Sequence, residues 1–332
     1  MNVRRRILVL PTLVLASAFV LIGFSNTAQA VENAANTLKI SPVRTDVEIQ
    51  PGGTKTVTTI ITNLTNSPMT VSAVQNDFIA GDERGTPALI LDANKFAPTH
   101  SLKRFLAPLK DVEIPAKESK EVNVVINVPM NAQAGGYFGA VRFAPTTPDG
   151  GGQVNTSASV ASLILLTVTG DLTEKLDLTN FDIRQRGKTA TFFGDSRDLE
   201  LAVRFRNVGS IQEGPFGKVA VKQGNKVVYE TDFNNTTPRE VVLPDSARRW
   251  DVPLKDIGDF GYYTVSATFT YGKKNQTIQI DKSFWVIPLS FIIAAGIGLV
   301  VLIALIVALV FLIKKRRRNS TKKSRNRISR RR

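Results

Sequence analysis

Apolar and polar residues alternate along most of the chain between residues 31 and 285. The clearest stretches are rich in Val, Ile, Thr and aromatic residues, and they cover residues 56–62, 121–128, 199–206 and 262–271. Such alternation is typical of β-strands that bury one face and leave the other in water. Turns rich in Gly, Pro and Asn separate these stretches, and no long helical period lies among them. The pattern predicts an all-β fold of two tandem immunoglobulin-like β-sandwiches, over residues 31–170 and 171–285.

A different pattern follows the second predicted sandwich. Residues 286–313 contain no charged side chain, and this run exceeds the roughly 20 residues with which a helix crosses a bilayer. A buried core helix of this length would carry a polar face, which is missing here. The run therefore predicts a single C-terminal transmembrane helix. Its end is marked by five consecutive cations, Lys314, Lys315, Arg316, Arg317 and Arg318.

The N-terminus has the composition of a secretory signal. Arg4, Arg5 and Arg6 precede an apolar stretch over residues 7–24, and Ala28-Gln29-Ala30 places small residues where a signal peptidase cleaves. We predict a signal peptide over residues 1–30 that is removed after Ala30. Without cleavage, the same stretch would remain as a second membrane anchor.

Charge is concentrated at the two ends of the chain. The formal net charge is +15, and residues 314–332 hold 12 Lys and Arg without an acid. Residues 31–285 contain 28 basic and 28 acidic residues, so the predicted sandwiches are neutral overall. Cations directly after an apolar span hold a tail in the cytoplasm beside anionic lipid, which favours a lipid partner over a nucleic acid. The expected topology is type I, with residues 31–285 outside the cell.

Residue types needed for catalysis are scarce. The chain has no cysteine and one histidine, His100, which leaves no zinc cluster and no Cys-His arrangement. The absence of cysteine also excludes a lipoprotein anchor and disulfide stabilisation, and in an exported protein it favours a bacterium with a single membrane. We expect a protein that is not an enzyme, without catalytic residues, cofactor or metal.

Two halves of the predicted β region repeat the same order of features. A strand ends at Asn63 in the first half and at Asn207 in the second, a turn with Pro115 or Pro244 follows, and each copy then reaches a Gly-aromatic strand. From Asn63 to Pro115 is 52 residues, whereas from Asn207 to Pro244 is 37. The first sandwich therefore carries about 15 additional residues, which fall within residues 75–109.

This insertion mixes aromatic and charged residues, as recognition loops do. The alternative is an ordinary edge hairpin whose aromatic residues fold into the core. The candidate ligand-binding residues in it are Phe78, Arg84, Phe96, His100, Arg104 and Phe105.

The stretch GGYFGAVRF at residues 135–143 predicts a special strand. Gly135 and Gly136 permit a turn with positive φ, and Gly139 permits close backbone approach or a bulge. Tyr137 and Gly139 share one face with the next alternate residues, while Phe138 and Arg142 lie on the other. We expect the first face to be core. The second offers Phe138 and Arg142 as further candidate contacts to a glycan, although structural needs alone also explain the pattern.

Three segments resemble one known family. They are ISPVRTDVEIQPGGTKTVTTIITNLTNSPMTV, VEIPAKESKEVNVVINVP and GGYFGAVRF, within residues 38–169. Together they resemble the N-terminal domain of the WxL-interacting proteins, surface proteins of Gram-positive bacteria with two immunoglobulin-like domains, a membrane helix and a basic tail. The resemblance implies that the first domain binds peptidoglycan and that the second docks a partner surface protein.

These observations favour a membrane-anchored bacterial cell-surface protein with a binding, adhesion or scaffolding role. Its first domain would contact peptidoglycan or another surface protein. The alternative is an accessory or sensor subunit of a membrane complex, in which the helix couples extracellular binding to a cytoplasmic partner. Replacing the helix and tail with an unrelated anchor would preserve adhesion and abolish signalling.

Overall fold

The computed structural model describes residues 37–92, 94–146 and 159–328, with side chains to residue 315. The predicted signal peptide and the last residues of the basic tail lie outside this part of the chain. The first group of elements comprises β1 (Leu38–Ser41), β2 (Arg44–Ile49), β3 (Thr54–Asn63), β4 (Met69–Ala80), β5 (Pro87–Leu89), the 3-10 helix η2 (Lys103–Phe105), β6 (Val112–Ile114), β7 (Ser119–Asn127), β8 (Gly135–Pro145) and β9 (Val160–Val168). The second comprises β10 (Leu176–Gln185), β11 (Lys188–Thr189), β12 (Phe192–Phe193), β13 (Leu199–Asn207), β14 (Phe216–Gln223), β15 (Lys226–Phe233), β16 (Ala247–Pro253), β17 (Gly261–Tyr271) and β18 (Gln276–Val286), followed by α1 (Leu289–Ile328).

Strands β1–β9 form the first sandwich. Among the described residues, one sheet has the order β1-β3-β7, and the other has the order β2-β9-β8-β4-β5, with β6 also paired to β4. Alternate residues of both sheets point inward, because successive side chains of a strand face opposite ways. The core between the sheets includes Ile61, Val124, Phe143 and Leu166, each fully buried.

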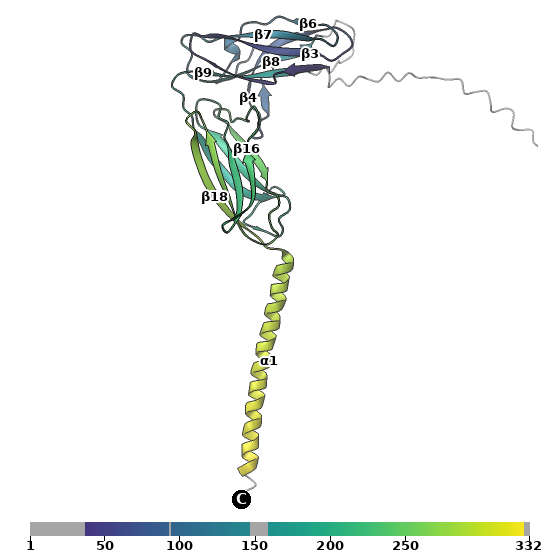
Figure 1. Cartoon of the computed structure of the whole chain (residues 1–332), viewed down its shortest axis with the longest axis vertical. Coiled ribbons are helices and arrows are strands. Elements are labelled where there is room, and N and C mark those ends of the chain that lie inside the picture. Colours follow the sequence, from purple (N-terminus) through teal and green to yellow (C-terminus); the bar gives the residue numbers. More distant parts are fainter. Residues whose placement is uncertain (1–36, 93, 147–158, 329–332) are drawn as a thin grey trace, which may run out of the picture.

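Strands β10–β18 form the second sandwich, with sheets β11-β10-β13-β16 and β12-β18-β17-β14-β15 in the part of the chain that the structure describes. Its core is more aromatic, and Phe205, Phe233 and Phe269 meet edge to face or tilted at 4.8–6.3 Å. The alternation predicted for residues 262–271 is confirmed, because buried and more exposed residues alternate along β17. The chain is thus all-β with immunoglobulin-like sandwiches and one apolar C-terminal helix in the described residues (Figure 1).

The internal repeat is confirmed by two equivalent asparagines. Asn63 and Asn207 are fully buried, and each side-chain oxygen accepts a hydrogen bond from the backbone N–H two residues later. Each amide donates to the carbonyl four residues later and to a carbonyl next to the second turn, Ile114 O or Val242 O. Buried amides need such partners, so one asparagine in each sandwich fastens the same two loops.

Helix α1 begins where the second sandwich ends. Val286, which we assigned to the membrane helix, instead pairs with Gly261 in the sheet and is fully buried. Pro288 then accepts the first helical hydrogen bond, from the N–H of Phe291. The span Leu289–Lys315 contains an 18-residue window with a mean hydropathy of 3.3, and no part of that window is buried. Among the described residues, this is the one helix long and apolar enough to cross a membrane. The backbone remains helical into the basic tail, and Lys314 and Lys315 are exposed.

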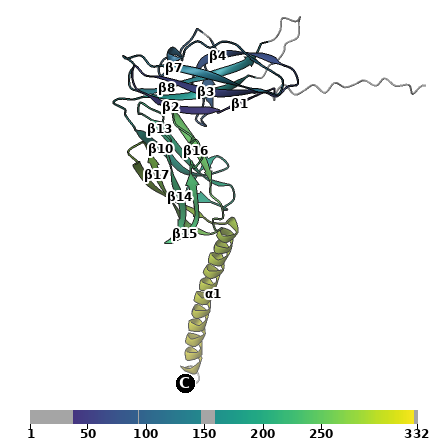
Figure 2. The ribbon, with the colours of Figure 1, turned by 45° about the horizontal axis from the view of Figure 1, so that its top comes forward.

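The first sandwich lies across the end of the second, opposite the end from which α1 leaves (Figures 1 and 2). The connection between β9 and β10 is short, so the two sandwiches meet directly. Several contacts at this junction determine where the candidate residues lie.

Candidate functional site

The outer face of the larger sheet of the first sandwich is covered by the second. Phe78, Phe138 and Leu165 form a separate buried cluster on this face, and Val241 and Leu243 of the β15–β16 loop pack against it. Phe138 is 2% exposed and Phe78 is 4% exposed. The interpretation of Phe138 as a glycan contact is therefore wrong for this structure, because the face that it shares with Arg142 is an interdomain interface.

Most aromatic candidates of the insertion are brought together beneath its surface. Phe78 lies 6.0 Å from Phe138, His100 lies 5.8 Å from Phe138 and 6.4 Å from Tyr137, and Tyr137 lies 4.8 Å from Phe105, between ring centroids. His100 has a φ of 59° and its Nδ1 lies 2.6 Å from Gly136 O. These rings attach the insertion to β8, as the edge-hairpin alternative predicted for the aromatic residues.

Three consecutive polar residues at the middle of β4 hold the insertion from below. Gln75 donates to Ala107 O, and Asn76, fully buried, donates to Ile90 O at 2.8 Å. Asp77 is also fully buried, and its two carboxylate oxygens accept the N–H groups of Ala97 and Lys103, each at 2.8 Å. A carboxylate that receives backbone donors fixes a loop strongly, so the insertion is an ordered part of the sandwich.

The exposed part of the insertion is an aromatic-basic surface, which we call the Phe96 patch and define as Phe96, Lys103 and Arg104. Phe96 is 43% exposed. Lys103 Nζ lies 4.8 Å and Arg104 Cζ 4.7 Å from the centroid of its ring, within range of cation–π attraction. The structure therefore joins two predicted candidates, Phe96 and Arg104, at the surface.

The remaining candidates lie elsewhere. Arg142 is half-buried, and its Nε is 3.4 Å from Asn76 Oδ1, so it supports the insertion from β8. Arg84 is exposed on the β4–β5 hairpin, where its N–H donates to Asp82. Neither reaches the Phe96 patch through any contact in the described residues.

The glycines of residues 135–143 follow the prediction in part. Gly135 has a positive φ of 154°, but it is the first residue of β8 and pairs with Val168 instead of forming a turn. The close approach predicted at Gly139 is present, since a Cβ there would lie 3.0 Å from Leu102 Cβ. Gly136 has no positive φ. It is instead a site of close approach, since its N–H donates to Ser210 O of the second sandwich at 2.8 Å and a Cβ there would lie 2.7 Å from Phe138.

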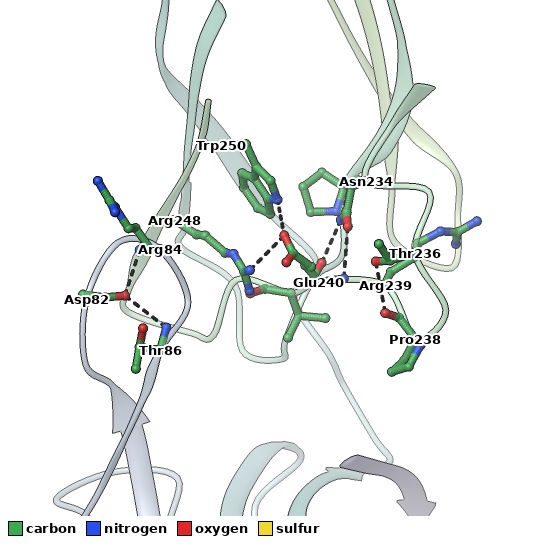
Figure 3. Close-up of polar contacts among 12 residues, drawn as sticks. Asp82, Arg84, Thr86, Asn234, Thr236, Pro238, Arg239, Glu240, Arg248 and Trp250 are labelled. Carbon is green, nitrogen blue, oxygen red and sulfur yellow. Dashed lines mark hydrogen bonds and ion pairs between the residues drawn. The ribbon is translucent and has the colours of Figure 1, made fainter. Parts of the chain in front are cut away.

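A crevice with a volume of about 200 Å³ opens between the two sandwiches (Figure 3). The β4–β5 hairpin forms one wall and the β15–β16 loop the other. The residues that line it include Arg44, Phe78, Leu165, Arg239, Val241 and Arg248. This wall of the second sandwich was not found from the sequence, because residues more than 150 positions apart form the crevice and neither segment carries a recognisable motif.

Glu240 organises the second wall of the crevice. Its carboxylate accepts a hydrogen bond from Trp250 Nε1 at 2.5 Å and pairs with Arg248 at 2.8 Å (Figure 3). Burial lowers the pKa of the Arg248 guanidinium, and the charge of Glu240 opposes that shift. Arg248 packs against Gly85, where a Cβ would lie 2.2 Å from the guanidinium carbon and where φ is +88°. Only glycine fits both conditions without strain.

Polar contacts fix the two sandwiches relative to each other. Glu83 of the hairpin accepts two hydrogen bonds from Arg204, at 3.0 and 2.7 Å, and its backbone carbonyl accepts Arg249 N–H at 2.6 Å. The Arg204 guanidinium holds the pKa of Glu83 below its usual value. Arg44 of β2 donates to Arg239 O at 2.7 Å. Planar bidentate pairs also fix orientation, and the junction therefore presents the Phe96 patch in one orientation.

A second groove, with a volume of about 400 Å³, lies on the other side of the same loop and contains Glu213. Glu213 is 4% exposed, and its Oε1 has no hydrogen-bond partner in the described part of the chain. Burial, with a smaller effect of the Glu174 charge, raises the pKa of Glu213 to about 7.

No protein-family model and no curated protein matches the sequence. Among solved structures, the chain is similar to the class 5 fimbriae chaperone CfaA (12% identity, TM-score 0.39), covering 74% of this chain and 98% of that one. It is also similar to a chain of the Salmonella enterica SafA pilin–SafB chaperone complex (13%, TM-score 0.33, 73% and 95% covered) and to the E. coli chaperone DraB (16%, TM-score 0.30, 75% and 96% covered).

Proposed function

We propose that this protein is a single-pass membrane-anchored surface protein that binds the cell wall through the Phe96 patch and is not an enzyme. The observation that carries this proposal is the patch itself, an exposed ring with two cations on a loop that Asp77 fixes from below. Recognition residues commonly sit on loops held by a rigid scaffold.

The chemistry of the patch suits peptidoglycan. Peptidoglycan exposes the C–H faces of sugar rings and carries peptide carboxylates. An exposed aromatic face offers apolar contact to the first, and Arg or Lys pairs with the second. The apolar helix supports anchoring by its length and hydropathy. The cations after it support a cytoplasmic tail beside anionic lipid, with both sandwiches outside.

Sedimentation with purified insoluble peptidoglycan tests the proposal. The full chain in detergent micelles should pellet with the wall, and the Phe96→Ala/Arg104→Ala variant should bind at least tenfold more weakly, if these contacts supply about 1.4 kcal/mol or more. A matched control is Ile60→Ala/Lys120→Ala, which removes one exposed apolar and one exposed basic residue from the opposite sheet.

Three results are distinguishable. Loss of binding in the patch variant alone supports the proposal. Equal pelleting of all three proteins keeps the wall as ligand and rejects the patch. If the unmodified chain stays in solution, the wall is not its ligand, and another surface protein becomes the partner to seek.

A further inference from the structure

The outer face of the β17–β18 pair is polar along most of its length and aromatic at the end beside α1. In the described register, the outward rungs nearest the first sandwich pair Thr270 with Thr277, Thr268 with Gln279, Ser266 with Asp281 and Thr264 with Ser283. All are polar, as expected for a sheet face in water. The last rung, beside α1, pairs Tyr262 with Trp285.

This last rung continues onto the next strand. Phe192 of β12 is the parallel partner of Trp285, so Phe192, Trp285 and Tyr262 form a row across three strands, which we call the aromatic row. The three residues are 65%, 39% and 47% exposed, and the rings of Tyr262 and Trp285 lie 4.9 Å apart. The core does not require them, because the alternate residues Phe193, Tyr263 and Phe284 already fill it.

The aromatic row stands at the entrance to the helix. Trp285 N–H donates to Thr191 O and Ile287 N–H donates to Phe193 O, each at 2.8 Å, so β12 binds the chain up to the start of α1. Phe260, 50% exposed, lies 4.7 Å from the ring of Phe291 in the first turn of the helix. The apolar surface of the helix therefore continues onto the sandwich without a linker.

We propose that the aromatic row and Phe260 insert into the headgroup region of the leaflet that α1 enters, so that the second sandwich is seated on the bilayer in a fixed orientation. Tyr and Trp favour this region because their rings are apolar while their O–H and N–H groups remain hydrated. The proposal rests on the membrane anchoring proposed above. It commits to lipid as the occupant because the row is continuous with the membrane-crossing surface.

The natural absence of cysteine makes a direct test available. Nitroxide labels on Phe192→Cys and, separately, on Thr268→Cys report accessibility to lipid-soluble oxygen and to a water-soluble nickel chelate. The full chain is reconstituted in phosphatidylcholine vesicles. Thr268 lies on the same face as Tyr262, six residues along β17 and therefore about 20 Å away, and both labelled positions are exposed.

The expected result is an oxygen-to-nickel ratio several-fold higher at position 192 than at position 268. Replacing Tyr262 and Trp285 by Ser should lower the ratio at position 192 towards that at 268. Water-like ratios at both positions, in protein that floats with the vesicles, would overturn the seating while keeping the anchor. High ratios at both would mean that the sheet lies flat on the membrane, which also contradicts the proposal. Protein that fails to float would refute anchoring and seating together.

Discussion

The buried carboxyl group of Glu213 should make the free energy of unfolding depend on pH by an amount that can be measured. Its carboxyl is almost completely buried beside the β15–β16 loop, its backbone pairs with Val242 in both directions, and its Oε1 lacks a partner among the described residues. Burial disfavours the charged form, and the nearby Glu174 carboxylate adds to this effect, which together raise the pKa to about 7. We predict that Glu213→Gln stabilises the protein at alkaline pH and has little effect in acid.

The magnitude follows from linkage between proton binding and folding. Moving the pKa from 4.5 to about 7 corresponds to about 3 kcal/mol, since each pH unit is worth ~1.4 kcal/mol. Between these values the folded state keeps a proton that the unfolded state has released. Stability from this group is therefore complete below pH 4.5, falls as pH rises and levels off above pH 7. The neutral amide of Gln lacks that dependence.

Urea unfolding of residues 37–286 at about pH 4.5 and about pH 8.5 measures the difference. Helix α1 contributes no residue to the described core clusters, so this segment retains both cores. Both tryptophans, Trp250 and Trp285, lie in the second sandwich, so fluorescence reports the unfolding of that sandwich.

At each pH, the free energy of unfolding of the wild type is subtracted from that of Glu213→Gln, which removes the contributions of the other carboxylates. Glu83 and Asp82, for example, have lowered pKa values and stabilise the fold above the pKa values of the unfolded chain. The difference should grow by up to about 3 kcal/mol between the two conditions. The reasoning would be refuted if the difference in unfolding free energy were the same at both pH values. It would also be refuted if Glu230→Gln, on the exposed face, gave the same pH-dependent difference.

Gly85→Ala should destabilise the junction by about 2 kcal/mol, roughly half from the positive φ and half from displacing Arg248 from Glu240. Gly187→Ala is its control, because that glycine also has a positive φ (+77°) but has open space around it. If both variants lost the same free energy of unfolding in urea, the Arg248 side chain would be moving aside without cost. Asp77→Ala should cost about 3 kcal/mol by leaving the N–H groups of Ala97 and Lys103 unpaired. Hydrogen exchange should then accelerate over residues 97–105. The control Asp92→Ala removes the acceptor of Asn94 N–H, outside that segment, and should leave exchange over residues 97–105 unchanged. Unaltered exchange in the Asp77 variant would contradict its role as an anchor.

Local pattern explains which parts of this fold are predictable from the sequence. Strands such as β17 alternate strictly, so their boundaries and buried faces follow from the residues alone. The correspondence of Asn63 with Asn207 is visible because each lies at the end of an alternating strand. The residue pattern does not locate the end of β18, because Val286 is equally apolar in a sheet core and in a membrane helix. Only its pairing with Gly261 distinguishes the two.

The candidate site was less predictable for a different reason. Aromatic residues are common both in ligand-binding sites and in hydrophobic cores. Phe78 and Phe138 are buried because Val241 and Leu243 of the second sandwich cover them. No local pattern reports such a contact. Phe96 lies beside Ala97, whose N–H donates to Asp77, yet its own side chain is 43% exposed. Recognising this from the sequence would require knowing the partners of the Asp77 carboxylate.

The direct run of β18 into α1 also has a mechanical consequence. A load applied to the first sandwich enters the second near β10 and leaves it through the last residue of β18, at the opposite end of the domain (Figure 1). The load then acts along β18, whose pairing with β17 extends from Gln276 to Val286. Because the hydrogen bonds of an antiparallel pair are perpendicular to the strands, they are sheared together instead of breaking one at a time. Under the proposed function, β18 is thus the element best placed to bear tension between the cell wall and the bilayer.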